Sequence, residues 1–380
     1  MLGILRRSRV ADENESRMRV CLNMIVKDET AVIERCLRSV LPYIDCWAIA
    51  DTGSTDGTQD RICQLLSHLP GELIERPWVD FATNRNEALE LARRHGDYAL
   101  IIDADDLLEV KPGRVFRNLD GPGYALEIVD KVTNYWRDAL VRLDVDWTWK
   151  GVVHEHLTCS QLAGVKKLGG ARIRRVGGGA RSQGDLVEKY RRDADVLRRA
   201  LADEPDNARY VFYLAQSLFD AGEMTEAIEV YQRRVDIGGW AEEVYFSKFM
   251  IAQLKQQLGY PFNDVVAAYL DAWRFRPSRA ESACFLARYL RAHGRHEEAR
   301  DYARIACSTL PTTDSLRINR HAYGWLARYE LAASLYALHD YAACIRTCEE
   351  MLSDPLLPPQ EVARVRQNIA AATAMATRPA

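Results

Sequence analysis

The hydrophobic pattern of this 380-residue chain changes its period once, near Val176. Up to that point, short apolar runs alternate with stretches in which apolar residues recur every three or four positions, and beyond it only the second spacing remains. Alternation of the two patterns is typical of strands connected by amphipathic helices, whereas the second pattern alone indicates helices. The sequence therefore predicts an α/β unit followed by an all-α unit, and its length suits two domains.

The first part of the chain contains five apolar runs with the character of strands and three amphipathic stretches between them. The expected strands are 20–26, 46–51, 71–77, 98–105 and 123–129, and the expected helices are 30–44, 58–69 and 82–95. Because this order is that of βαβ units, we expect a parallel sheet covered by helices on both faces. Such sheets bind their ligands at the carboxyl ends of the strands. The stretch 172–185, rich in glycine and arginine, ends this pattern and is expected to form a linker.

Two of the expected strands end on carboxylates. In AIADTGSTDGT, Asp51 closes the second strand ahead of a turn rich in glycine and hydroxyl groups. This pattern is typical both of a tight turn that caps a helix and of a strand end that presents Asp51 to a ligand. In LIIDADD, a strand delivers Asp103, and Asp105 and Asp106 follow it. Carboxylates this close repel one another unless a cation lies among them, and Mg²⁺ or Mn²⁺ suits such oxygen ligands. An acidic turn that caps a helix is the alternative.

The second part of the chain repeats one local pattern, in which leucine or isoleucine precedes alanine on an apolar helix. The alanines are Ala215, Ala252, Ala287 and Ala332, at intervals of 37, 35 and 45 residues. Each repeated segment is followed by a second amphipathic stretch, such as 225–235 or 297–307. A period near this length, with small residues where paired helices touch, resembles tetratricopeptide repeats. Helical hairpins of no particular family are the alternative.

Charge and cysteine content exclude several classes of function. The net charge of -3 provides no overall basic field of the kind that nucleic-acid binding needs. The nine cysteines form no CxxC pair, so no zinc ribbon is expected, and reduced thiols indicate a cytoplasmic protein. No segment approaches the ~18 apolar residues of a membrane span. Residues 1–17 lack the pattern of a signal peptide and are expected to form a tail.

Five motifs carry a resemblance to a known family. They are CLNMIVKDE, RCLRSV, ADTGSTDGT, FATNRNEAL and IIDADD, and in this order they resemble the nucleotide-binding half of a family-2 glycosyltransferase with the GT-A fold. The likeness covers about residues 18–160. GVVHEHL and the helical repeats resemble a subgroup of these enzymes with tetratricopeptide-like repeats. The resemblance implies a transferase domain over 18–176, a linker over 177–185 and a repeat domain over 186–376.

The resemblance also implies a chemistry and a donor site. The enzyme would invert the anomeric centre and take a hexose, by default glucose, from a UDP-linked donor with the help of Mn²⁺ or Mg²⁺. Asp51 would contact the uracil or the ribose, although many relatives carry a second acidic residue where this chain has Thr52. Asp103 would reach the ribose and Asp105 would hold the metal, with Asp106 in support.

Two further residues are expected at the donor. The NRN stretch matches a segment that contacts the nucleotide in the family, which makes Arg85 and Asn86 candidates. An exposed arginine on a helix surface is an equal alternative for Arg85.

The segment WTWKGVVHEHL is expected to complete the chemistry. An inverting transferase needs a general base for the acceptor, and we expect Glu155 in that role beside Asp103, with His154 as a ligand of the metal or the diphosphate. In a regular strand, however, neighbouring side chains point to opposite faces, so both can face one site only where the segment turns. The carboxylates held in reserve as bases are Asp144 and Asp146.

The remaining expectations concern a loop and the acceptor. Gly177–Gly179 would act as hinges of a loop over the donor, with Arg175 and Arg181 meeting phosphate. In the repeats, Trp240 follows two glycines and is expected to be exposed. With Tyr213 it is a candidate contact for the acceptor, and packing against the catalytic domain is the alternative for Trp240.

Three functions compete on the sequence alone. The first is transfer to a peptide or protein side chain recognised by the repeats. The second is transfer to a saccharide or glycolipid, with the repeats serving a homodimer or docking. The third is a non-catalytic interaction protein, which the intact carboxylates disfavour.

Overall fold

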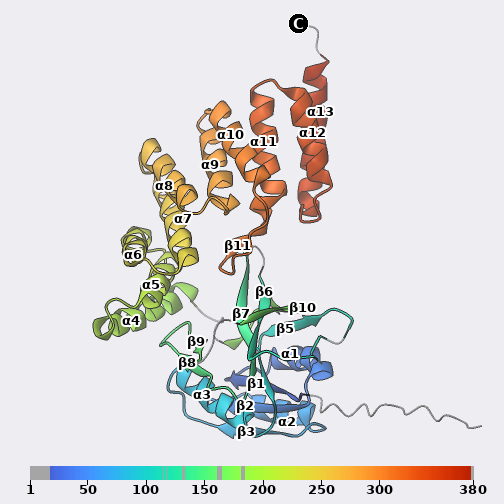
Figure 1. Ribbon diagram of the computed structural model, residues 1–380, viewed down its shortest axis with the longest axis vertical. Helices are drawn as coiled ribbons and strands as arrows, with labels where there is room; N and C mark the ends of the chain where they lie inside the picture. Colours follow the sequence, from blue (N-terminus) through green and yellow to red (C-terminus); the bar gives the residue numbers. More distant parts are fainter. Residues whose placement is uncertain are drawn as a thin grey trace, which may run out of the picture. The chain divides into compact units, whose positions relative to one another are not determined.

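This computed structural model describes residues 18–113, 115–116, 118–130, 133–160, 165–180 and 185–377. These residues divide into two compact units. The sheet unit comprises the described residues within 18–127, 137–151 and 155–180, and the helical unit comprises those within 128–136, 152–154 and 185–377. Figure 1 shows the strands and the helices α1 to α3 in the first part of the chain, and a succession of helices in the second.

The first 175 residues contain ten strands and three α-helices among the described residues. The strands are β1 (Val20–Val26), β2 (Cys46–Asp51), β3 (Gly71–Glu75), β4 (Tyr98–Ile101), β5 (Asp106–Val110), β6 (Gly123–Val129), β7 (Thr133–Arg142), β8 (Thr148–Lys150), β9 (His156–Thr158) and β10 (Lys166–Arg175). The helices are α1 (Ile33–Val40), α2 (Thr58–Leu66) and α3 (Phe81–Ala92), and a 3-10 turn, Leu41–Tyr43, follows α1. All eight expected strands and helices of this part therefore form, most of them shorter than expected.

The main sheet is mixed, so the prediction of a parallel sheet is wrong for half of it. Its strand order is β3-β2-β1-β4-β7-β6-β10-β5. β3, β2, β1 and β4 are parallel, but β7 runs antiparallel to β4, and β10 antiparallel to β5. Parallel neighbours need a crossover of about a dozen residues or more, and only three residues separate β6 from β7. The second half of the sheet lacks crossover helices because its connections are too short for them.

The parallel strands owe their place to continuous apolar runs. Every residue of β2 is buried, and so are six of the seven in β1. Helix α3 packs against β1 and β2, and α1 packs against β5 and α2. A strand buried on both faces lacks the alternation of a half-exposed strand, and each fully buried aliphatic side chain contributes about 1.5–3 kcal/mol.

Five of these ten strands were not anticipated from the sequence: β5, β7, β8, β9 and β10. β5 follows the acidic turn directly, and β10 pairs with it from Ala171↔Val110 to Arg175↔Asp106. Residues 172–175, expected to begin a linker, therefore belong to the sheet. β10 alternates exposed and buried residues near its end, and the buried Ala171 and Ile173 are its contribution to the core.

The second part of the chain is helical, as expected. Its helices are α4 (Leu186–Asp203), α5 (Ala208–Asp220), α6 (Met224–Ile237), α7 (Ala241–Gln257), α8 (Phe262–Phe275), α9 (Ala280–Ala292), α10 (His296–Ser308), α11 (Trp325–Ala337), α12 (Tyr341–Leu352) and α13 (Pro359–Ala376). Between α10 and α11 lie a short strand, β11 (Ile318–Asn319), and a 3-10 turn, Arg320–Tyr323. Successive helices pack side by side from α4 to α13 (Figure 1).

The repeated alanines lie where the helices of each hairpin meet. Ala215, Ala252, Ala287 and Ala332 are all buried, on α5, α7, α9 and α11. Each of these helices contacts the next helix in the chain. A small side chain at such a position lets two helices approach closely, which is the packing that the sequence predicted.

The same four helices end in the same way. Seven positions after each alanine lies a residue with left-handed backbone: Gly222, Gly259, Gly294 and His339, with φ of 82°, 71°, 75° and 62°. The next backbone N–H then donates to a carbonyl of the last turn, as from Asp340 to Leu335 at 3.0 Å. This bond satisfies a carbonyl that the helix end leaves unpaired, and its geometry favours glycine.

Across the described ranges, no helix is both long enough and apolar enough to cross a bilayer.

Candidate functional site

The first cluster of the candidate site forms where the chain leaves β4. That strand ends at Ile101 and β5 begins at Asp106, so the acidic turn lies between two strands. Asp103 uses both of its carboxylate oxygens there: Oδ1 accepts a hydrogen bond from Nη2 of Arg85 at 2.7 Å, and Oδ2 accepts one from Nη1 of Arg137 at 2.9 Å. Its side chain remains 33% exposed. Asp103 is thus fixed by two arginines but still open on one side.

Arg137 reaches Asp103 because of the strand register. β7 runs antiparallel to β4 with Leu140 opposite Leu100. Continuing this register for three residues past Leu100 brings position 137 opposite position 103. The sequence did not single out Arg137, because nothing local predicts that β7 neighbours β4.

Arg85 joins Asp103 to a second carboxylate. Its Nε donates to Oε1 of Glu155 at 2.6 Å, and its guanidinium lies 5.0 Å from the ring centroid of Trp149. The Arg85 and Glu155 side chains are each 11% exposed. A guanidinium is a planar fork of donors, which suits it to hold two carboxylates in fixed positions. Three of the predicted site residues therefore meet, and Arg85 is buried rather than exposed on a helix surface.

The arginines determine the charge of this cluster. Burial disfavours the ionised form of Asp103, but Arg137 and Arg85 outweigh it and hold the pKa of that carboxyl well below its usual range. Burial also disfavours the Arg85 cation, while Asp103 and Glu155 raise its pKa above the usual value. The carboxylate of Asp103 is therefore charged at any physiological pH.

A second group of carboxylates lies beside the first. Asp106 is buried, and its burial together with the charges of Asp103 and Asp105 raises its pKa to about 7. Burial likewise raises the pKa of Glu29 to about 7. The hydrogen bond from the N–H of Ala180 opposes this rise, and the charge of Asp105 adds to it. Both values are this high mainly because burial disfavours a charged carboxylate, and nearby negative charge adds to the effect.

Glycine at position 179 brings Glu29 and Asp105 to one point. A Cβ at Gly179 would lie 3.0 Å from Oε2 of Glu29 and 3.1 Å from Oδ2 of Asp105, which is closer than an ordinary van der Waals contact. The backbone N–H groups of Gly179 and Ala180 donate to Asp105 and Glu29 at 3.4 and 3.3 Å. Glu29 was not among the site residues predicted from the sequence, although it lies just after β1, as Asp51 lies at the end of β2.

The loop over these carboxylates carries the expected glycines. Gly177 and Gly178 have φ of 74° and 93°, a backbone that other residues rarely adopt. The Nη2 of Arg35 donates to the carbonyl of Asp105 at 3.1 Å and to that of Gly177, which ties the loop to the acidic turn. Arg175 ends β10 opposite Asp106, and Arg181 lies outside the described residues.

A divalent metal fits this group only in part. Within the described ranges, no group of three or more His, Cys, Asp or Glu side chains is arranged to hold a metal ion. Asp105 and Glu29 nevertheless provide two converging carboxylates. Mg²⁺ is commonly held by one or two carboxylates together with substrate phosphates and water. The residues therefore suit a metal that a diphosphate helps to hold, not a preformed cage.

His154, the other predicted metal ligand, has different surroundings. Its ring stacks on Tyr213 with 4.1 Å between the centroids and 12° between the planes, and its carbonyl accepts a hydrogen bond from Arg209 at 2.9 Å. Both contacts lie within the helical unit. The roles of His154 in metal binding and of Tyr213 in acceptor binding stay predictions.

The segment between β8 and β9 does bend, as the predicted roles of His154 and Glu155 required. His154 has a φ of 55° and Gly151 one of 114°. The two neighbouring side chains have separate partners, Tyr213 for His154 and Arg85 for Glu155. Asn86 fixes the hairpin from α3, because its amide donates to the carbonyl of Trp149 at 3.0 Å and accepts from its N–H at 2.8 Å. Both ends of the Asn86 amide are thereby occupied by the protein.

Asp51 lies at the end of β2 and is fully buried. Its Oδ1 accepts the backbone N–H groups of Gly53 and Ser54 at 2.9 and 2.8 Å, so it closes the turn that the sequence indicated. Its Oδ2 has no hydrogen-bond partner among the described residues. A buried carboxylate oxygen without a donor is costly, and a donor on a ligand would satisfy it.

Three other predicted residues lie elsewhere. Asp144 pairs with Arg142 at 2.6 Å, and Asp146 accepts hydrogen bonds from Cys159 and Ser160, so both reserve bases are engaged on the surface. Trp240 is 47% exposed at the start of α7, as its position after two glycines predicted.

Comparison with known families separates the two parts of the chain. Residues 21–142 match the profile of the glycosyl transferase family 2, and residues 188–239 match that of a tetratricopeptide repeat. The first match contains Asp51, Arg85 and the acidic turn, and it ends before Glu155.

One curated relative and several solved structures are similar to parts of the chain. A TPR repeat-containing protein of Synechococcus elongatus is 36% identical over 105 residues, 27% of this chain and 25% of that protein. The chain thus matches about a quarter of the length of that relative. A crystal structure of MamA protein has a TM-score of 0.35 at 15% identity and covers 46% of this chain and 95% of its own. The C-terminal part of a TPR repeat-containing protein from Cytophaga hutchinsonii has a TM-score of 0.39 at 15% identity, covering 50% and 69%.

Proposed function

The chain carries a glycosyl transferase family 2 domain followed by a tetratricopeptide repeat region, and we propose that it transfers a hexose from a UDP-linked donor to a peptide or protein side chain, with inversion. The observation that carries this proposal is the Arg85 bridge. It holds Asp103 and Glu155, which lie 52 positions apart in the chain, beside the carboxylates of Asp105 and Glu29. A nucleotide sugar needs acceptors for its hydroxyl groups, compensation for its diphosphate and a base for the acceptor, and this site offers groups for all three.

Asp103 supports donor binding. A carboxylate offers about four acceptor positions, and Arg85 and Arg137 occupy two of them. The exposed side of Asp103 can accept hydrogen bonds from the two ribose hydroxyl groups. Asp51 can accept one donor group of the nucleotide at Oδ2 if the turn at Gly53 opens toward the ligand.

Glu155 is the proposed general base. The acceptor atom attacks the anomeric carbon while its proton passes to Glu155, and the bond from that carbon to the diphosphate oxygen breaks. The electron pair of the broken bond leaves with the nucleoside diphosphate. Because the acceptor attacks from the face opposite this leaving group, the configuration at the anomeric carbon inverts. Arg85 holds Glu155 through Nε in one orientation, which fixes the direction from which the acceptor must approach.

Asp105 and Glu29 are the proposed holders of a divalent ion, together with the diphosphate. When bound, such an ion offsets the negative charge that develops on the leaving group. Burial is the main cause of the raised pKa of Glu29 and Asp106, and binding would offset the charge of Asp105 that adds to it.

The repeat region supports a polypeptide acceptor, because stacked helical hairpins present extended surfaces that suit peptides. A transferase of saccharides would need no such surface, and analysis of the products formed with a labelled sugar distinguishes the two. Products on a protein acceptor retain the sugar after proteolysis to peptides, whereas a glycan or glycolipid acceptor yields no labelled peptide.

The decisive experiment is calorimetric titration of the full chain with UDP, with and without Mn²⁺. We expect binding that strengthens with Mn²⁺ and that loses this dependence in Asp105→Asn. The control is Asp60→Asn, which removes an exposed carboxylate from α2 and should leave the titration unchanged. Failure to bind either UDP or GDP would refute the donor site, and metal-dependent binding that survives in Asp105→Asn would refute the role of Asp105.

A further inference from the structure

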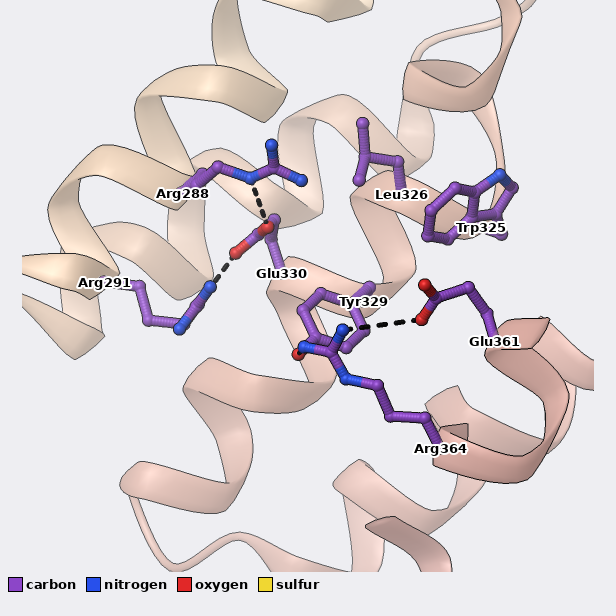
Figure 2. A pocket seen from close by; sticks show the side chains of 8 residues that line it. All are labelled: Arg288, Arg291, Trp325, Leu326, Tyr329, Glu330, Glu361 and Arg364. Atoms are coloured by element: carbon purple, nitrogen blue, oxygen red, sulfur yellow. Dashed lines mark hydrogen bonds and ion pairs between the residues drawn. The ribbon is translucent and has the colours of Figure 1, made fainter. Parts of the chain in front are cut away.

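The helical unit contains a cavity lined by arginines, distant in sequence from the transferase residues. Its volume is about 290 Å³. The lining comes from three helices: Arg288 and Arg291 on α9, Trp325, Leu326, Tyr329 and Glu330 on α11, and Glu361 and Arg364 on α13. Figure 2 shows these side chains around the cavity. The volume of this cavity is close to the lower limit for ligand pockets, which range over about 300–1,000 Å³, so the cavity suits one or two side chains.

A buried carboxylate orients two of the arginines. Glu330 is fully buried, and its two oxygens accept from Nε of Arg288 at 2.8 Å and Nε of Arg291 at 2.7 Å (Figure 2). Each arginine spends only its Nε on Glu330. The terminal Nη groups of both make no hydrogen bond or ion pair with the described residues. One buried anion therefore holds two cations whose strongest donors remain available.

The third arginine lies across the cavity on an aromatic ring. Arg364 is 4.6 Å from the centroid of Tyr329, donates to the hydroxyl of that tyrosine, and lies 3.5 Å from Oε2 of Glu361. The side chain of Arg364 is largely exposed, and that of Arg288 is partly exposed. Three cations and two carboxylates line the cavity, and the buried Glu330 is already shared by two of the cations. The lining thus has one positive charge in excess.

We propose that this cavity binds a carboxylate side chain of an acidic peptide, and so selects the polypeptide acceptor. Only the identification of the peptide as the acceptor rests on the proposed function, because peptide binding itself is a property of the helical unit. The planar forks of Arg288 and Arg291 match a carboxylate. Trp325, Leu326 and Tyr329 offer apolar surface to the aliphatic part of the ligand, and Glu361 can accept a backbone N–H of the peptide.

The charges of the cavity argue against a phosphate group as its ligand. A phosphate monoester carries a charge of about −1.5 to −2 near pH 7. Glu330 and Glu361 would both repel such a dianion, while the single excess positive charge of the lining matches a monoanionic carboxylate. The single excess positive charge of the lining therefore favours a ligand group with one negative charge over a group with two.

The test is calorimetric titration of the full chain with two hexapeptides, both acetylated and amidated at their ends. One alternates glutamate with alanine, and the other has glutamine in place of glutamate. We expect the glutamate peptide to bind at least about tenfold more tightly, the size expected for one charge-assisted contact. Equal affinity of the two peptides, or no binding of either, would overturn the proposal.

Three variants assign the binding to the cavity. Arg288→Gln combined with Arg291→Gln and Glu330→Gln removes the cations without leaving Glu330 as an unpaired buried charge, and should weaken the glutamate peptide about tenfold or more. Arg364→Gln leaves the contacts of Glu330 intact and should weaken binding of the glutamate peptide several-fold. This variant keeps the test valid if the triple variant misfolds. The control is Arg346→Gln, an exposed arginine of α12 outside the cavity.

Two further measurements separate the alternatives. Inorganic phosphate should not displace the glutamate peptide at equal concentration, and displacement that depends on Arg288 and Arg291 would overturn the carboxylate assignment. UDP titration of the same variants should match the unchanged chain. Peptide binding without UDP binding would refute the transferase while leaving this site intact, and UDP binding without peptide binding would do the reverse.

Discussion

The two units each bury arginines, and the difference between them separates a functional site from a structural one. In the helical unit, Arg234 gives Nε and Nη2 to Glu243 at 3.0 and 2.8 Å and Nη1 to the carbonyl of Gly238. The two fully buried arginines of this unit, Arg234 and Arg279, each have their own carboxylate partners, and their guanidinium donors end on oxygens of nearby residues. A pair of this kind leaves nothing for a ligand to bind.

The second buried arginine of the helical unit behaves in the same way. Arg279 binds Glu281, Asp314 and the carbonyls of Leu316 and Arg317, so it fixes the segment that leads into β11. Arg276 adds a second cation to Asp314. Two arginines thus face two carboxylates, and the charges balance.

The sheet unit has the opposite balance. Arg85 and Arg137 hold Asp103 and Glu155. Beyond them lie Asp105, Asp106 and Glu29, with only Arg35 and Arg175 nearby among the described residues, so five carboxylates face four arginines. Burial is the main cause of the raised pKa of Glu29 and of Asp106, and the neighbouring carboxylates raise both values further. Uncompensated charge is costly to fold, so its presence beside a fixed arginine bridge is a better sign of a ligand site than burial alone.

Neutralising one carboxylate in each unit tests this comparison most strongly. We expect Glu155→Gln to lower the turnover of UDP-glucose by about 10²–10⁴, the range for loss of a general base, while UDP still binds. The amide oxygen of glutamine can still accept the hydrogen bond from Nε of Arg85, so the fold should persist. The measurement is UDP release over time, with thermal unfolding in parallel.

Glu243→Gln is the matched change in the helical unit. It should lower stability and leave the rate per folded molecule unchanged, because Glu243 has only a structural partner. Normal turnover in Glu155→Gln would move the base to Asp144 or Asp146, and Asp144→Asn would then be the variant that loses activity.

Removing the cation from a balanced pair has the next largest effect. We expect Arg234→Ala to cost about 3–5 kcal/mol of unfolding free energy, because Glu243 is left buried and charged without a partner. Arg234→Met combined with Glu243→Leu should recover most of that loss, since an apolar pair of similar volume replaces the ion pair. Denaturant unfolding of the three proteins measures both values, and a single variant as stable as the original chain would show that the pair is not needed.

The parts of the fold that could be predicted are those written in local periodicity. β1, β2 and the helices of the repeats follow from apolar runs and from alanines at regular intervals, because burial there depends on the segment itself. β5, β10 and the antiparallel half of the sheet could not be predicted in this way. Their pairing depends on partners tens of residues distant, and β10 carries only two buried side chains near its paired end.

The same limit applies to the candidate site. Asp103, Asp105 and Glu155 stand in recognisable motifs, and the sequence named them. Arg137 could not be named, because only the register of β7 against β4 brings it to Asp103. Glu29 had a signal, its place after a strand, but its meeting with Asp105 depends on how the loop at Gly179 returns over the turn.

Two histidines with left-handed backbone give the smallest and sharpest version of the comparison. His339 takes the position that glycine holds in the other three repeats. It is exposed, and its ring contacts Tyr341 edge-on and forms a hydrogen bond with the hydroxyl of that tyrosine at 2.7 Å. His154 has nearly the same φ, but its ring is stacked on Tyr213. We expect His339→Gly to stabilise the protein by about 1 kcal/mol, because glycine adopts this backbone without the steric cost that a Cβ imposes. The melting temperature should rise by roughly 2–4 °C.

His154→Gly should show no such gain, because the relief of backbone strain is offset by the loss of the stacked ring, worth about 0.5–1.5 kcal/mol for aromatic pairs. Gly294→Ala is the reciprocal control and should destabilise the third repeat by about 1 kcal/mol. An equal gain in both histidine variants would mean that the ring of His154 contributes nothing to its position. Strain at position 154 accompanies a stacked ring, whereas strain at position 339 accompanies only exposed contacts with Tyr341 at a helix end that favours glycine.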